Sequence, residues 1–310
     1  MLMKMSLKLI ATLPALLLLA SCSGTNSPEK TDAAPQADSN THKAQSSEVM
    51  RIAAAANLAG VLPAVIDAYQ SEEAHSPDTA STPKPKIEVT YASSGKLFAQ
   101  INSGAPYDLF LSADQDFPAK YAQQQAAANV TVQPPFTYAR GQLALYSSNQ
   151  DVSTVKTLDT ASLQQLLITQ PNQSKKPIKI TLANPELAPY GASAKAFLQQ
   201  QGIYDSLNGN KTIIQAENIG QAFQYAHTAS TDYGFVALSQ LISAKVDPSN
   251  YLILQPGSYP AILQDGIVVS DSAAAIDFSH YLQSKPAQKL FADAGYLPVN
   301  AGHTASGSAK

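Results

Sequence analysis

Short runs of apolar residues alternate with longer amphipathic runs along most of the chain. The short runs are rich in β-branched and aromatic residues, which favour strands. The predicted strands are Met50–Ala55, Ile87–Tyr91, Asp108–Ser112, Leu143–Tyr146, Ile178–Leu182, Thr212–Gln215, Gly234–Val236 and Ala261–Val269. The clearest predicted helices are Leu58–Ser71, Lys96–Asn102, Ala192–Gln201 and Gln221–His227. This alternation predicts an α/β fold with mostly parallel sheets flanked by helices. A polar insert over 71–86 with three prolines interrupts it and predicts a surface loop.

The first 48 residues do not share this pattern. Lys4 and Lys8 precede an apolar run, which ends in small residues before Cys22, and this order predicts a signal peptide over residues 1–21. Cys22 is the only cysteine, so it cannot form an internal disulfide. The stretch Leu19-Ala20-Ser21-Cys22 resembles the lipobox of bacterial lipoproteins, which implies that Cys22 carries the lipid. Residues 22–48 are polar and predict a disordered linker, and residues 301–310 predict a disordered tail.

The charge balance excludes one class of partner. The chain has a net charge of −3, and its only two arginines are Arg51 and Arg140. No basic patch appears, so we expect no nucleic acid to bind. Removal of residues 1–21 takes away two lysines and no acid, which leaves the mature chain near −5.

Four predicted strands lead into helices through residues that suit a helix start. The four corners are Ala53–Leu58, Tyr91–Leu97, Asn184–Ser193 and Glu217–Gln221. Asn57 is the expected N-cap of the first, although Pro63 indicates that the regular helix begins later. Ligands of α/β proteins gather where strands end, and helix N-termini attract anions. At any single corner, ordinary helix capping would give the same residues as an anion site, so both interpretations stay open.

Two other kinds of chemistry can be compared with these corners. Ser93-Ser94-Gly95-Lys96 matches the S-x-x-K motif of acyl-transfer enzymes, with Ser93 as nucleophile and Lys96 beside it. The partner motifs of that class are missing, so an acyl-transfer enzyme is the weaker alternative. The five histidines show no metal-ligand spacing. Glu217 is best interpreted as an acid in the first turn of a helix.

At these corners the sequence resembles the molybdate-binding proteins of bacterial ABC uptake systems. The matching stretches are Ala53–Leu58, Ser93–Ile101, Gly104–Asp114, Ala183–Pro185, Ala188–Gly191, Glu217–Ala222 and Tyr233–Leu238. They run through most of the mature chain, and the stretch Leu109–Asp114 is the most specific.

The resemblance implies a two-lobed, type II periplasmic binding-protein fold with the ligand cleft between the lobes. Lobe one would comprise residues 49–139 and 258–300, and lobe two residues 140–257. Carried over by position, Asn57 and Ser94 would donate hydrogen bonds to the anion from lobe one. The backbone N–H groups of Tyr190 and Ile219 would donate from lobe two, and Ala56 would offer only its backbone. These groups would bind the oxygens of the anion, not the metal atom itself. Many relatives have a ligand tyrosine at the position of Ala237, and here Asn57 would supply that donor.

The resemblance also implies a function without a chemical step. We expect a monomer without a cofactor that binds molybdate, and tungstate equally well, and delivers it to an ABC permease. The protein would act in the periplasm or on the outer face of the cell membrane, anchored by its lipid. The alternatives within the same class are sulfate, phosphate or another small anion.

The predicted anchor can be tested on its own. Cys22→Ser removes the only thiol that can carry the lipid. Because a buried acyl chain contributes about 0.8 kcal/mol per methylene to membrane binding, we expect this variant to leave the membrane fraction. The measurement is fractionation of cells that express the full chain, with Ser27→Ala, outside the lipobox, as a control that keeps the cysteine. Retention of Cys22→Ser in membranes would exclude lipidation as the tether.

Overall fold

The computed structural model describes residues 49–71, 84–155, 157–169 and 177–299. The predicted signal peptide, Cys22, the linker, most of the polar insert and the tail over 301–310 lie outside the described residues. In the described ranges, no helix is both long enough and apolar enough to cross a membrane.

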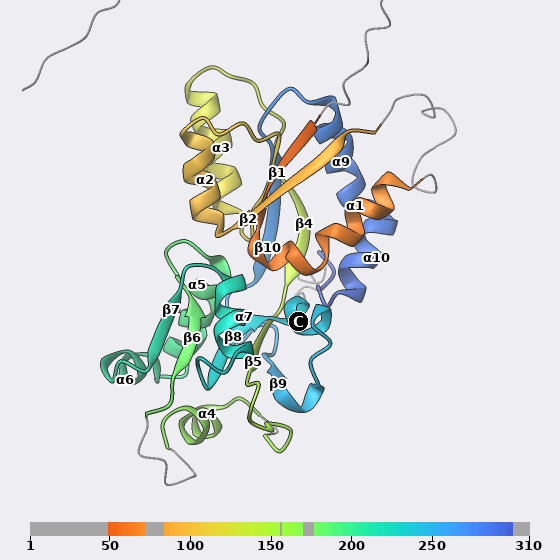
Figure 1. Ribbon diagram of the computed structural model, residues 1–310. Coiled ribbons are helices and arrows are strands. Elements are labelled where there is room, and N and C mark those ends of the chain that lie inside the picture. Colours follow the sequence, from red (N-terminus) through yellow and green to blue (C-terminus); the bar gives the residue numbers. More distant parts are fainter. Residues whose placement is uncertain (1–48, 72–83, 156, 170–176, 300–310) are drawn as a thin grey trace, which may run out of the picture. The chain divides into compact units, whose positions relative to one another are not determined.

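The described residues form two five-stranded sheets (Figure 1). The first has the order β2 (Lys86–Ala92), β1 (Val49–Ala55), β3 (Leu109–Leu111), β10 (Ile262–Val268), β4 (Phe136–Gly141). The second has the order β7 (Ile213–Ala216), β6 (Ile180–Ala183), β8 (Tyr233–Ala237), β5 (Leu143–Tyr146), β9 (Tyr251–Ile253). We call the first sheet with its helices lobe one and the second sheet with its helices lobe two.

Helices flank both sheets. Lobe one carries η1 (Ala56–Gly60, a 3₁₀ turn), α1 (Leu62–Gln70), α2 (Ser94–Asn102), α3 (Asp116–Ala127), α9 (Ala273–Leu282) and α10 (Lys285–Asp293). Lobe two carries α4 (Thr160–Leu167), α5 (Pro189–Gln200), α6 (Tyr204–Gly209), α7 (Ile219–His227) and α8 (Leu238–Ser243). This arrangement confirms the predicted α/β fold with two sheets.

Both sheets mix parallel and antiparallel pairs. β1 pairs in parallel with β2 and β3, and β6 does so with β7 and β8. The strands beside the crossings, β10 with β4 and β5 with β9, pair antiparallel. The chain leaves the first sheet between Gly141 and Leu143, and it returns between Ile253 and Ile262. The predicted lobe boundaries at 139/140 and 257/258 stay a prediction.

The residues of strand β1 are almost all apolar because both faces of the strand are covered. Met50, Ile52 and Ala54 belong to one core, together with residues of α1, α9 and α10, whereas Ala53 packs with residues of α2 and α3. Figure 1 shows these two groups of helices on opposite sides of the first sheet. Successive side chains of a strand point to opposite faces, so a strand covered on both faces is apolar at nearly every position. This core holds the carboxyl end of β1 in place at the junction of the lobes.

One local prediction is wrong. Asn57 does not cap a regular helix: it lies inside η1, and the α-helix begins at Leu62. Pro63 stands in the first turn of α1, where its missing N–H would have no partner in the helix anyway. The delayed helix start that Pro63 predicts is therefore confirmed. Strands β4 and β9 were absent from the sequence prediction.

Candidate functional site

A small cavity lies at the junction of the two lobes. Its volume is about 10 Å³. A space of this size holds about one water molecule, so it suits a very small ligand and excludes a sugar or an amino acid. The lining residues are Ala55, Ala56, Ala92, Ser93, Ser94, Ala113, Ala188, Pro189, Tyr190, Asn218 and Ile219. None of them is a charged residue.

Four helix starts meet at this cavity. The turn η1 and the helices α2, α5 and α7 follow β1, β2, β6 and β7, and the first or second residue of each lines the cavity. The first N–H groups of a helix have no partner within it. Among the described residues, no hydrogen bond is made by the backbone N–H of Ala56, Ser94, Tyr190 or Ile219. The structure thus brings these four predicted site residues together, with free donors at one small space.

Ser94 adds a side-chain donor. Its hydroxyl oxygen accepts a hydrogen bond from the backbone N–H of Ala113 at 2.9 Å, and the side chain is buried. That bond occupies one lone pair of the oxygen and leaves its proton free to donate. Ala113 follows β3 and was not predicted as a site residue, because a backbone N–H that orients a neighbour leaves no trace in the sequence.

The starts of α5 and α7 explain why single N–H groups remain free. Pro189 opens α5 and has no N–H, so Tyr190 carries the first donor of that helix. At α7 the side chain of Asn218 accepts the N–H of Gln221 at 2.9 Å, which leaves the N–H of Ile219 unpaired. α5 also lies very close to β6 at Gly191. A Cβ on this residue would be 2.1 Å from the backbone oxygen of Ala183, so only glycine fits there.

Asn57 does not line the cavity in this structure. Its side-chain amide donates to Gln264 Oε1 at 2.9 Å and to the Tyr296 hydroxyl at 3.0 Å, and the residue is fully buried. Its side-chain oxygen has no hydrogen-bond partner. Donation from Asn57 to an anion therefore stays a prediction. Ala237 is also fully buried and outside the lining, and its N–H donates to Gln240.

The Ser93 hydroxyl has a different hydrogen-bond partner from the Ser94 hydroxyl. Its hydroxyl donates to Glu217 Oε1 of lobe two at 3.0 Å, and the Lys96 ammonium lies 3.7 Å from the same oxygen. Both groups of the S-x-x-K motif thus contact Glu217, and no hydrogen bond joins Ser93 to Lys96 in the described structure. The Ser93 hydroxyl thus contacts a carboxylate of lobe two and not the Lys96 amine that the motif would pair with it.

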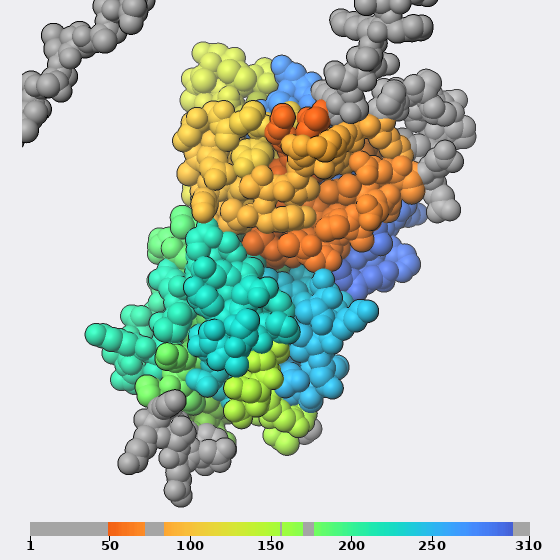
Figure 2. All heavy atoms as spheres, viewed as in Figure 1, coloured from red at the N-terminus to blue at the C-terminus, as the bar shows by residue number. Residues whose placement is uncertain are grey.

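The lobes touch across the cavity. The backbone N–H of Gly95 in lobe one donates to the carbonyl of Leu187 in lobe two at 2.9 Å. Figure 2 shows the atoms of α7 in contact with those of η1 on one face, where no open cleft is visible. The lobes are therefore closed against each other beside the cavity, which stays partly open.

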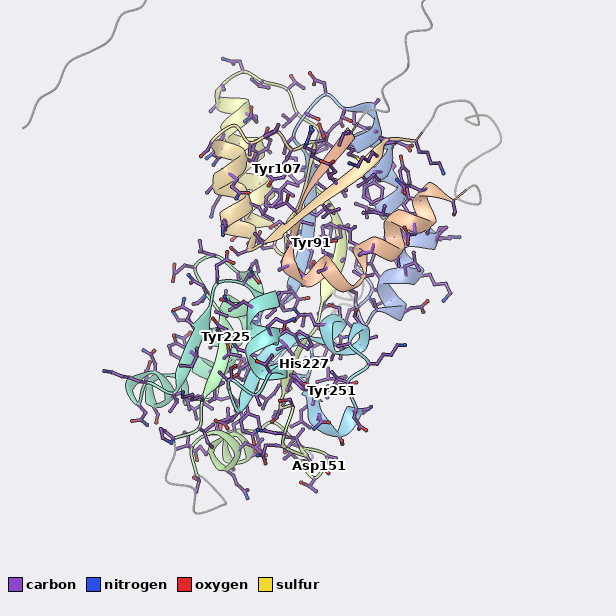
Figure 3. The ribbon with its side chains drawn as sticks, in the orientation of Figure 1. Tyr91, Tyr107, Asp151, Tyr225, His227 and Tyr251 are labelled. Carbon is purple, nitrogen blue, oxygen red and sulfur yellow. The ribbon has the colours of Figure 1, made fainter. Side chains whose placement is uncertain are left out.

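The tyrosine hydroxyls closest to the cavity are neutral. Burial raises the pKa of the Tyr190 hydroxyl well above its usual range, and that of Tyr296 to about 12. The tyrosines labelled in Figure 3 lie in β2, α7, β9 and the loop before β3, and none of them lines the cavity. His227, also labelled there, packs on Phe223 and lies 2.9 Å from the Tyr146 hydroxyl. The donors at the cavity are thus uncharged groups.

The comparisons with known proteins agree with this geometry. Two lobes that meet at a small cavity are the architecture of a solute-binding protein, and the family model described as bacterial extracellular solute-binding protein matches residues 50–297. The chain belongs to this family. It is 31% identical over 244 residues to the molybdate-binding protein ModA of Rhodobacter capsulatus, covering 77% of this chain and 89% of that protein. The solved structure of the Azotobacter vinelandii periplasmic molybdate-binding protein is similar, with a TM-score of 0.65 and 27% identity. That match covers 80% of this chain and 99% of the other.

The contact of Glu217 with Ser93 and Lys96 predicts a measurable effect on lobe closure. We expect Glu217→Ala to speed hydrogen exchange at the Gly95 amide, which is protected only while the lobes are closed. One partly exposed hydrogen bond of about 1 kcal/mol corresponds to a roughly fivefold faster exchange. Exchange is measured by NMR or by fragmentation mass spectrometry. Glu186→Ala removes an exposed acid of the same lobe and is the control, and an equal effect in that variant would contradict the assignment.

Proposed function

We propose that this protein binds molybdate, and tungstate with similar affinity, in the cavity between its lobes. The convergence of four unpaired N–H groups and the Ser94 hydroxyl on a space without charged residues carries this proposal. The similarity to the Rhodobacter capsulatus and Azotobacter vinelandii molybdate-binding proteins supports the choice of anion. Asn57 is included in the proposed site, with its contribution to be measured.

The energetics of such a site are favourable without an arginine. An anion that leaves water loses a large hydration energy, which only hydrogen bonds can replace inside a closed cavity. Hydrogen bonds to a charged partner contribute about 1.5–3 kcal/mol each. Several of them together, less the cost of association, correspond to dissociation constants in the micromolar to nanomolar range.

The donors also favour one kind of oxyanion. A site made of donors suits molybdate, tungstate or sulfate, which carry no proton near neutral pH. Phosphate keeps a proton there and would require an acceptor, and no carboxylate lines the cavity. Sulfate is distinguished from molybdate only by size, so it remains the alternative that the experiment must exclude.

We further propose how the binding step serves transport. The exported chain would be held at the outer face of a membrane by lipidated Cys22, with residues 22–48 as tether. Anion binding would favour the closed lobes by its higher affinity for that state. An ABC permease would then recognise the closed form, and no chemical step or cofactor takes part.

A thermal shift experiment tests the ligand. A dissociation constant of about 1 μM or less and millimolar molybdate give at least about 4 kcal/mol of stabilisation. For a chain of this size we expect the melting temperature to rise by roughly 8–15 °C. Tungstate should match molybdate, while sulfate and phosphate should give much smaller shifts. An unchanged melting temperature with molybdate and tungstate would disprove the proposal, and a larger shift with sulfate would change the assigned anion.

Two neighbouring serines give a matched pair of variants. Ser94→Ala removes a hydroxyl whose proton is free for the anion, so molybdate affinity should fall by about 1–3 kcal/mol. Ser93→Ala removes a hydroxyl that already donates to Glu217, so its effect should be smaller. Isothermal titration of both variants with molybdate gives the comparison. Equal losses would argue against the assignment of Ser94 as the donor.

A further inference from the structure

Gln264 lies next to the site without lining the cavity. It belongs to β10 in lobe one, and its side chain is fully buried. Its amide oxygen accepts from Asn57 Nδ2 at 2.9 Å, and its amide nitrogen donates to the Tyr190 hydroxyl of lobe two at 3.2 Å. One side chain therefore joins the residues at two different corners of the cavity.

The surrounding backbone makes room for this bridge. The pairing of β10 with β4 shifts register between Gln264 and Asp265, so that Tyr138 has no residue opposite it. Such a shift re-aims the side chains beside it. Gly141, at the end of β4, leaves the space that the bridge fills. A Cβ there would lie 2.1 Å from the Tyr190 hydroxyl oxygen and 2.8 Å from Gln264 Nε2.

The bridge acts on the part of Tyr190 that does not face the anion. The ring of Tyr190 is fully buried, and its hydroxyl end is held by Gln264. The other end of the residue is the backbone at the start of α5, where the unpaired N–H lines the cavity. Because the buried ring cannot move independently of α5, the bond at the hydroxyl fixes how closely this helix start approaches lobe one.

We propose that Gln264 is a positioning residue for the bound anion. By holding the Tyr190 hydroxyl from lobe one, it sets the place of the α5 donor when the lobes are closed, and so it sets affinity without touching the ligand. This inference rests on the proposed function. A positioning role differs from an ordinary stabilising role, because the hydrogen bond between Gln264 and Tyr190 would form only when the lobes close.

A double-mutant cycle with molybdate as the probe tests the inference. Gln264→Met keeps the length of the side chain and removes its three hydrogen bonds, to Asn57, Tyr138 and Tyr190, whereas Tyr190→Phe keeps the backbone N–H and removes only the hydroxyl. We expect each variant to raise the dissociation constant about tenfold. In the Gln264→Met background, Tyr190→Phe should weaken binding by no more than a further twofold or so, because the bond between these two residues is already missing there.

A third variant separates positioning from stability. Tyr69→Phe also removes a buried hydroxyl, one that bonds Asp277 within lobe one at 2.7 Å, away from the cavity. It should lower the melting temperature of the ligand-free protein while the dissociation constant stays within twofold. If Gln264→Met fails to fold, Tyr190→Phe and Tyr69→Phe still give the comparison.

The outcomes distinguish the two levels of the proposal. Wild-type affinity in Gln264→Met and Tyr190→Phe would overturn the positioning role, and so would losses that multiply fully in the double variant. In either case binding by the unaltered protein leaves the proposed function intact. No binding of molybdate, tungstate, sulfate or phosphate by the unaltered protein would overturn the proposed function, and this inference with it.

Discussion

Unpaired N–H groups at helix starts are the constraint on which this structure depends. Each group is a strong donor that must find a partner, and a buried donor without one costs about 1–3 kcal/mol. The closed lobes bring four such groups and one hydroxyl to a single small space. Only an acceptor that is rich in oxygen and small enough to be enclosed satisfies all of them at once. Closure and ligand capture are thus two aspects of the same interaction.

The two lobes achieve this with equivalent topologies. In the first sheet the strand order is β2-β1-β3-β10-β4, and in the second it is β7-β6-β8-β5-β9. β1 and β6 therefore occupy matching places, as do β2 and β7, and these four strands lead to the four corners. Each lobe supplies one pair of donors from the same two positions. No repeat is visible in the sequence, so the equivalence lies in the path of the backbone.

The positions of the four strand-to-helix corners could be predicted from the sequence, but the directions of the side chains at those corners could not. Capping residues and glycines after apolar runs predicted the corners in which Ser94, Tyr190 and Ile219 lie, and the family resemblance singled out these three residues within them. The inward direction of Asn57 depends on Gln264, which is 207 positions away along the chain, and no local pattern contains that contact. Strand β9 is only three residues long, and Ile253 within it is 44% exposed, so its apolar pattern is weak.

Donors that belong to the main chain have a consequence for how the protein can change over time. A substitution at Ala56 or Ile219 replaces the side chain but keeps the N–H, so neutral drift at these positions leaves the donors of the proposed site in place. Proline is the exception, because it removes the N–H itself. Chains of this family can therefore diverge at the binding surface while they retain the same specificity. The identity of the lining residues is a poor guide to the ligand, and the path of the backbone is a better one.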